Sequence, residues 1–290
     1  YVNALGLYLP GGGSPDNIDP TGTVGTPTIT NLSFTIAVTS ISEDNVTVEL
    51  LSSGGTQLVT SGDLGTTRSY TISHSESSGG TYSYTVRLTD AAGNTTEYAV
   101  SGVVLLFYET LTFTAEGAGS GTITGNGTTS VTIEKTTNGT GGQGNWNYGP
   151  YVTQGFTQPF TLEFKIPNAS SSTAQHMMMS LNDALVSDGG NYTSLDYAAY
   201  TQTTSYWDIY NNSTQIGNQV AAGDSWDPTQ INRIVYADNL IKHYNGSTLI
   251  YTSPTLSHTS ARYIDTSIEY LMTVTDIRGI KARWNGTAYV

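Results

Sequence analysis

The strongest constraint on the fold is a stretch near the C-terminus, residues 231–253, which reads INRIVYADNLIKHYNGSTLIYTS. Apolar and polar side chains alternate through it, and this is the period of a β-strand with one buried face. Two dipeptides, Asp238-Asn239 and Asn245-Gly246, lie where turns are needed. Asn-Gly supplies the positive φ angles that a two-residue hairpin demands. The stretch therefore predicts three short antiparallel strands joined by tight turns.

The composition extends this prediction to the whole chain. Only 11% of the 290 residues are charged, while Gly (32) and Tyr (20) are abundant. Tyr and Thr suit pleated, half-buried surfaces, and Gly suits turns. Residues 176–181, HMMMSL, contain good helix formers, but Met177, Met179 and Leu181 would share one face of a strand. We expect a strand there and an all-β protein.

Charge and cysteine content exclude several functions. The formal net charge is −13 with ten basic residues spread along the chain, so no basic cluster favours nucleic acid or an anionic membrane surface. The chain has no cysteine, so disulfides and thiol chemistry are excluded. No apolar run approaches the ~18 residues of a spanning helix, so we expect no membrane insertion. Because the chain starts at Tyr1, we interpret it as processed or as part of something longer.

Three segments follow from the pattern of turns and strands. Residues 1–25 form an N-terminal segment and a Gly/Pro-rich linker. Residues 26–107 and 108–290 are expected to be two β-sandwiches. In the first, strands are predicted at 26–30, 33–40, 45–52, 56–60, 67–74, 81–89 and 95–106.

Seven strands in about 80 residues fit an immunoglobulin-like or fibronectin III-like module. Residues 81–100, TYSYTVRLTDAAGNTTEYAV, are similar to the last hairpin of bacterial Ig-like domains, with the turn at residues 90–94. The resemblance implies that this module is a spacer.

The second sandwich carries a different resemblance. Beyond the meander, strands are predicted at 159–166, 176–182, 194–200, 205–210 and 267–275, with a terminal hairpin at 282–290, ARWNGTAYV. In the spacing of its strands and in the aromatic residues of LDYAAY (195–200) and WDIY (207–210), this segment resembles the concanavalin A-like (laminin G-like) sandwich domains of virion surface proteins and secreted adhesins. This implies a jelly-roll sandwich over about 110–290, in a protein present in many copies or as a homo-oligomer.

The sequence lacks the residue patterns of the catalytic sites that we considered. Glycosidases need two carboxylates ~5–5.5 Å apart, which strand residues two apart would supply. The i+2 partners of Glu163, Glu269 and Asp208 are Lys165, Leu271 and Tyr210. None of the four histidines accompanies a Gly-x-Ser-x-Gly elbow, and His243 is interpreted as a sheet-face residue. We expect no enzymatic activity.

Calcium is the one cofactor for which the sequence offers ligands. Asp208 and Asn212, in DIYNN, have the Asp-x-aromatic-x-Asn spacing that resembles the metal loop of legume lectins. Calcium prefers such oxygen ligands. The alternative is a strand aspartate that runs into an Asn-Asn-Ser turn.

Carbohydrate binding needs exposed rings beside amide groups. Residues 145–151, NWNYGPY, place amides and rings in a Gly/Pro-bounded loop; the candidate residues are Asn145, Trp146, Asn147, Tyr148 and Tyr151. Trp226 is a second candidate. The alternative is that these rings cap the ends of the sandwich.

The leading hypothesis is therefore a non-enzymatic, extracellular structural protein of a virion: a phage fibre, tail or capsid-decoration protein. Its partners would be other virion proteins and cell-surface glycans. The alternatives are a cell-surface or filament adhesin and a secreted polysaccharide-degrading enzyme.

Overall fold

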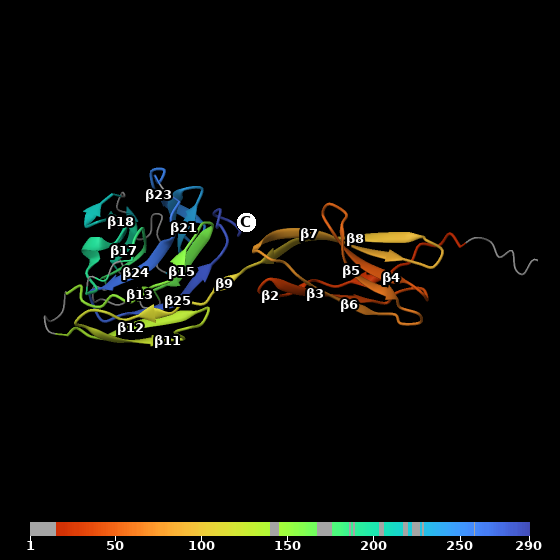
Figure 1. Cartoon of the computed structure of the whole chain (residues 1–290), viewed down its shortest axis with the longest axis horizontal. Helices are drawn as coiled ribbons and strands as arrows, with labels where there is room; N and C mark the ends of the chain where they lie inside the picture. Colours follow the sequence, from red (N-terminus) through yellow and green to blue (C-terminus); the bar gives the residue numbers. More distant parts are fainter. Residues whose placement is uncertain are drawn as a thin grey trace, which may run out of the picture. The chain divides into compact units, whose positions relative to one another are not determined.

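The computed structural model describes residues 16–290 except 140–144, 167–175, 186, 188, 203–205, 217–219, 222–226, 228 and 258. The chain divides into two compact units at Leu105–Leu106 (Figure 1). Apart from one 3₁₀ turn at Tyr192–Ser194, the regular elements of the described residues are strands, which confirms the all-β prediction. Within this part of the chain there is no helix that is long and apolar enough to cross a membrane.

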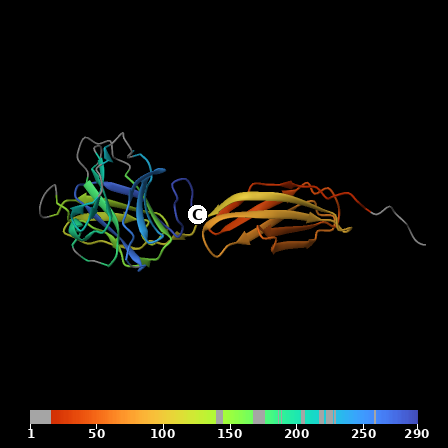
Figure 2. The ribbon, with the colours of Figure 1, turned by 90° about the horizontal axis from the view of Figure 1, so that it is seen from above.

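The first unit is a sandwich of two four-stranded sheets, whose layers are visible in Figure 2. In one sheet, β1 (Thr23–Val24) and β2 (Thr28–Thr30) pair with β3 (Ser33–Thr39), and β6 (Tyr70–Ser75) pairs with the other edge of β3. The second sheet has the order β5-β4-β7-β8; these are Gln57–Asp63, Thr47–Ser52, Gly80–Thr89 and Thr95–Leu105.

The core of the first unit follows from strict alternation. Phe34, Ile36 and Val38 of β3 are buried while their neighbours are exposed. They belong to one cluster with Val48 and Val86 of the facing sheet. The predicted strands are confirmed to within a few residues.

The predicted boundary between the linker and the first sandwich was wrong. Residues 23–24, assigned to the linker, form β1 and pair with Val38 and Thr39. Val24 packs against the core, and Gly22 donates a backbone hydrogen bond to the Tyr98 hydroxyl. A short segment with one apolar side chain gives no alternation to detect, so sequence patterning missed it.

The second unit is a larger sandwich. Its eight-stranded sheet has the order β11-β12-β25-β15-β21-β22-β23, with β9 (Tyr108–Glu109) paired to β25. These strands span Ser120–Thr124, Val131–Thr137, Thr273–Ile280, Phe160–Lys165, Asn232–Ala237, Leu240–Asn245 and Thr248–Thr252.

Its seven-stranded sheet has the order β14-β24-β16-β17-β18-β19, with β20 (Val220–Ala221) also paired to β18. These strands span Gly155–Phe156, Arg262–Ile268, His176–Asn182, Ala198–Gln202, Tyr206–Asn211 and Thr214–Gln215. A separate pair joins β10 (Phe113–Thr114) to β13 (Tyr151–Val152).

The second core lies between these two sheets. Met177, Met179 and Leu181 of β16 belong to one buried cluster with Leu162 and Phe164 of β15. Residues 176–182 therefore form a strand with the predicted buried face. The buried cluster between the sheets consists of apolar and aromatic side chains.

The C-terminal meander is confirmed in detail. β21, β22 and β23 pair antiparallel in sequence order. Asp238 (φ 54°) and Asn239 (φ 58°) form the first turn, and Gly246 (φ 57°) lies in the second. These left-handed angles are the ones that a tight hairpin requires.

The predicted strand at 267–275 is wrong. β24 ends at Ile268 and β25 begins at Thr273, so a connection between the two sheets occupies its middle. The Glu269 amide donates to the His176 carbonyl, and the Met272 carbonyl accepts from the Lys135 amide. The apolar residues on both sides of the crossing made two strands look like one.

The C-terminal hairpin covers the outward face of the eight-stranded sheet. Trp284 and Tyr289 form a β-bridge, and Trp284 packs on Val235, Ala237 and Tyr244. The Arg233 guanidinium lies 3.9 Å from the centre of the Trp284 ring. Sequence patterning predicted the hairpin, and the structure shows what it covers.

Candidate functional site

A second apolar cluster lies outside the sandwich core, on the outward face of the seven-stranded sheet. Strand alternation turns Met178 and Tyr200 away from the core residues Met177 and Ala199. Met178, Leu195, Ala198 and Tyr200 are buried there, and Trp146, Tyr192 and Tyr210 pack against them. A half-buried group of rings on the outward face of a sheet is not needed to hold the two sheets together.

The rings of this group contact one another in tilted and edge-on geometries. The Trp146 ring centre lies 5.1 Å from that of Tyr192 and 5.9 Å from that of Tyr200. Tyr210 meets Tyr200 at 5.3 Å, and His176 meets Tyr270 at 5.1 Å. We call these six residues the outer aromatic cluster: Trp146, His176, Tyr192, Tyr200, Tyr210 and Tyr270.

A carboxylate partner fixes the orientation of the histidine in the cluster. His176 Nδ1 lies 2.5 Å from Glu269 Oε2, and the two side chains are 13% and 12% exposed. The Tyr200 hydroxyl lies 3.2 Å from the same nitrogen. Among the described residues, His176 Nε2 has no hydrogen-bond partner, although it is buried. The imidazole therefore holds one nitrogen against a carboxylate, while the other is buried without a partner in the described part of the chain.

Sequence analysis did not find the His176–Glu269 pair. The residues are 93 positions apart. They meet because β16 pairs with β24 in a register that aligns Met177 with Ile268. No local spacing signals such a contact, because it depends on which strands become neighbours.

Lys135 holds the loop that carries Trp146. Its ammonium nitrogen lies within hydrogen-bonding distance of four acceptors, which share its three hydrogens: the Asn145 carbonyl (3.1 Å), Asn147 Oδ1 (2.8 Å), the Ile268 carbonyl (2.8 Å) and the Glu269 carbonyl (2.7 Å). Burial lowers the pKa of Lys135 to about 8, and the Glu269 charge opposes this shift. The side chain ties the loop to the end of β24, where Glu269 lies.

The structure separates the residues of the predicted sugar-binding loop. Trp146 lies in the outer aromatic cluster, but Tyr148 is 1% exposed and belongs to the sandwich core. This removes the Tyr148 ring from the surface that a ligand reaches. The Asn147 amide is engaged by Lys135 and by the Asn138 carbonyl, and Tyr151 begins β13. Trp226 lies outside the described residues.

Two glycines explain why Tyr148 is buried. A Cβ on Gly149 would lie 2.5 Å from Gly190 Cα, and a Cβ on Gly121 would lie 2.6 Å from the Tyr148 ring. The backbone crosses so closely at both points that a side chain would clash. The Tyr148 ring fills the space beside Gly121.

The predicted metal ligands have different partners in the structure. Asp208 is 1% exposed, and burial raises its pKa, while its Oδ1 accepts from the Ile209 amide. Asn212 is exposed and donates its amide hydrogen to Asp196 Oδ1 at 3.1 Å. Burial raises the pKa of Asp196 to about 6, and the charge of Asp183 adds to the shift. In the described part of the chain, the contacts of Asp208 and Asn212 do not bring the two side chains together as ligands of one metal ion.

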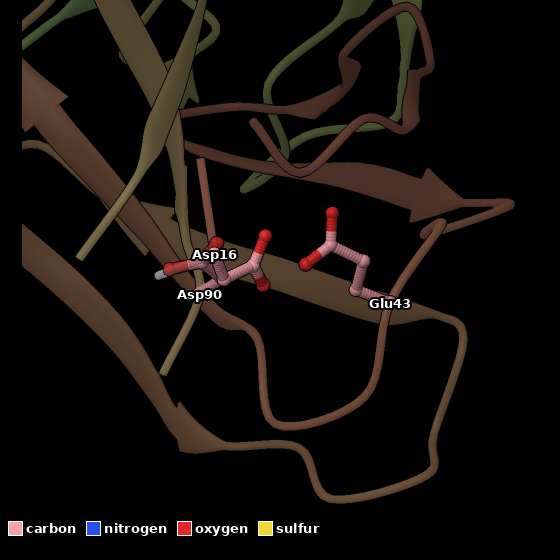
Figure 3. A group of neighbouring side chains, drawn as sticks. All are labelled: Asp16, Glu43 and Asp90. Carbon is pink, nitrogen blue, oxygen red and sulfur yellow. The ribbon is translucent and has the colours of Figure 1, made fainter. Parts of the chain in front are cut away.

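Acidic side chains gather elsewhere, in the first unit. The ligand oxygens of Asp16, Glu43 and Asp90 lie within 4.8 Å of one another, and among the described residues they form the only such group. Figure 3 shows the Glu43 carboxylate turned toward the two aspartates. Burial and the charges of Asp16 and Asp90 raise the pKa of Glu43.

Asp90 behaves differently within this trio. Its burial is outweighed by hydrogen bonds from Asn94 and the loop amides, which lower its pKa. The same bonds form the predicted turn between β7 and β8, where Gly93 has a φ of 94°. Within the trio, the Asp90 carboxylate is therefore stabilised in its ionised form, whereas the ionised form of Glu43 is disfavoured.

Comparison with known proteins assigns the first unit. Residues 15–105 match the model of the family described as bacterial Ig-like domain, which covers less than half of the chain. No curated protein matches the chain.

Among solved structures, similar folds include a galectin-like protein of unknown function from Bacillus subtilis. It is 10% identical, has a TM-score of 0.37, and the match covers 60% of this chain and 97% of that one. A structure of carbohydrate-binding modules from the β-sandwich superfamily is 14% identical, with a TM-score of 0.33 and coverages of 91% and 98%. These scores are too low to carry a functional argument.

Proposed function

We propose that the chain is a non-enzymatic, extracellular attachment protein whose second unit binds glycans through the outer aromatic cluster. In this proposal the bacterial Ig-like unit is a spacer, and the second unit is a concanavalin A-like sandwich. We place the protein on a virion, as a phage fibre, tail or capsid-decoration protein present in many copies.

The observation that carries the proposal is a set of half-buried rings on the outward face of a sheet. Trp146, Tyr192 and Tyr210 pack there without entering the sandwich core. Sugar C–H faces stack on such rings, while hydroxyl groups need polar partners beside them. His176 and Glu269 are polar groups at the same place.

The carboxylates that we considered as catalysts are engaged separately, which supports a binding role. Glu163 accepts from Arg233 Nε at 2.7 Å and from the Tyr289 hydroxyl. Glu269 pairs with His176 on the other sheet. Each has a structural partner: Glu163 lies on β15 of the eight-stranded sheet, whereas Glu269 lies just beyond the end of β24.

A glycan array tests the proposal, with Trp146→Ala compared with wild type. We expect wild type to bind one class of glycans and Trp146→Ala to lose at least tenfold in affinity while remaining folded. Trp284→Ala is the matched control, because this tryptophan covers the other sheet. Equal binding by all three proteins would place the glycan site elsewhere, and binding by none would reject the function.

A cell-surface or filament adhesin remains the second proposal, and a secreted polysaccharide-degrading enzyme the third. Immunogold labelling of virions with an antibody to the second unit separates the first two. Turnover of an array ligand that Glu269→Gln abolishes would favour the enzyme.

A further inference from the structure

We propose that His176 is the polar anchor of the glycan site and that its Nε2 accepts a hydroxyl hydrogen from a neutral sugar. This inference rests on the proposed function and names the chemistry of its ligand. It also assigns a specificity-determining residue that lies outside the loop on which sequence analysis concentrated.

The first step is the state of the imidazole. Glu269 Oε2 lies 2.5 Å from Nδ1, so the proton of a neutral ring belongs on Nδ1, which donates to the carboxylate. The Nε2 atom then carries a lone pair and is an acceptor. Glu269 thus acts as a positioning residue that fixes both the tautomer and the orientation of the ring.

The second step is the environment of Nε2. This atom is buried and has no hydrogen-bond partner among the described residues. A buried polar atom without a partner costs free energy, which a suitable ligand group would recover. The surroundings are aromatic: the centres of the Trp146, Tyr200 and Tyr270 rings lie 6.4, 5.7 and 5.1 Å from that of the imidazole.

The third step is how a ligand reaches Nε2. Trp146 is only partly buried and packs on His176 through its ring, while the backbone of its loop is held by Lys135. In this proposal, a rotation of the indole gives a ligand access to Nε2 while the loop stays in place. The displaced ring remains available to stack on the sugar whose hydroxyl group binds His176.

The fourth step is the charge of the ligand. Glu269 lies beside His176 just beyond the end of β24, Asp208 belongs to β18 of the same sheet, and the chain has a formal net charge of −13. The nearby cation, Lys135, is committed to four oxygen acceptors of the protein. A sialic acid or uronic acid would meet the Glu269 carboxylate while Lys135 is already engaged by the protein, so the site favours neutral sugars.

The experiment uses a panel of neutral oligosaccharides of glucose, galactose and mannose, each with a counterpart that carries sialic or glucuronic acid. We expect wild type to prefer the neutral members and His176→Phe to lose at least tenfold in affinity for them. The matched control is His74→Phe, because His74 pairs with Glu76 at 3.1 Å in the first unit. We expect this control to bind like wild type.

A second measurement does not depend on the variant folding. In ¹⁵N-labelled wild type, the Nε2 resonance of His176 should move on saturation with the best neutral ligand, while that of His74 should not. An unmoved Nε2 resonance, or full affinity in His176→Phe, overturns the anchor and leaves glycan binding intact. Preference for the acidic glycans overturns the ligand class, and binding to no member overturns the proposed function itself.

Discussion

At the scale of single residues, a buried histidine makes the second unit sensitive to acid. His243 is fully buried in β22, and its ring centre lies 6.4 Å from that of Trp207 and 6.0 Å from that of Tyr251. Sequence analysis treated it as a sheet-face residue, but that face is the interior of the sandwich. Burial lowers the pKa of His243 to about 3, and the backbone of Tyr197 opposes the shift.

This pKa predicts the direction in which folding stability changes with pH. The unfolded chain takes up a proton near the ordinary pKa of 6.5, whereas the folded protein does not until about 3. Stability is therefore lost as the pH falls from about 6.5, and we expect His243 to contribute a loss of about 2 kcal/mol between about pH 7 and about pH 5. Urea unfolding of wild type and His243→Leu at both values measures the difference, with His74→Leu as control. Equal pH dependence in wild type and His243→Leu would contradict it.

The acidic trio of the first unit gives a second prediction at this scale. In buffer with a chelator, Glu43→Gln should raise the melting temperature, because it removes a charge that burial and repulsion by Asp16 and Asp90 disfavour. Asp63→Gln is the control, since Asp63 is an exposed acid outside the trio. A lower melting temperature in Glu43→Gln would contradict the repulsion. Calcium should then be added: stabilisation of wild type that Glu43→Gln lacks would identify the trio as a cation site.

At the scale of elements, Lys135 connects β12, the Trp146 loop and the end of β24. Lys135→Met removes a charged donor from four acceptors and should cost about 3 kcal/mol. Because its pKa is lowered to about 8 from 10.5, wild type should also gain stability between about pH 8 and about pH 9.5, and the variant should not. Urea unfolding followed by tryptophan fluorescence measures both effects. Lys165→Met is the control, because Lys165 forms an exposed pair with Asp276; an equal loss there would refute the role of Lys135.

Strands that are determined by their own residue pattern and their adjacent turns were predictable from the sequence. The meander of β21, β22 and β23 follows from its alternation and from turn residues that accept positive φ. The strands β11 and β12 were not predicted, because they lie in a segment rich in Gly, Thr and Ser that reads as a series of turns, and β12 is fixed by pairing with β25. The candidate site shows the same limit. Trp146 was found from its loop, but Tyr148 was assigned to the surface and the His176–Glu269 pair was missed, since both depend on contacts between distant strands.

At the scale of the whole molecule, the chain has two hydrophobic cores with separate members. The first consists of residues from Phe34 to Leu105, and the second of residues from Leu111 to Ile277. A unit that buries its own apolar surface has the means to fold by itself. We therefore expect fragments 16–105 and 106–290 to melt cooperatively, each near the temperature that it shows in the intact chain.

Two matched core variants test whether the two units unfold independently. Ile72 and Leu162 are both fully buried, one in each core. Changing either to Ala should cost about 3 kcal/mol. In calorimetry of the intact chain, Ile72→Ala should lower only the transition of the first unit and Leu162→Ala only that of the second, because distant sites in separate cores act additively. If either variant shifted both transitions equally, the two units would unfold as one cooperative body, and the Ig-like unit would not be the independent spacer that we propose.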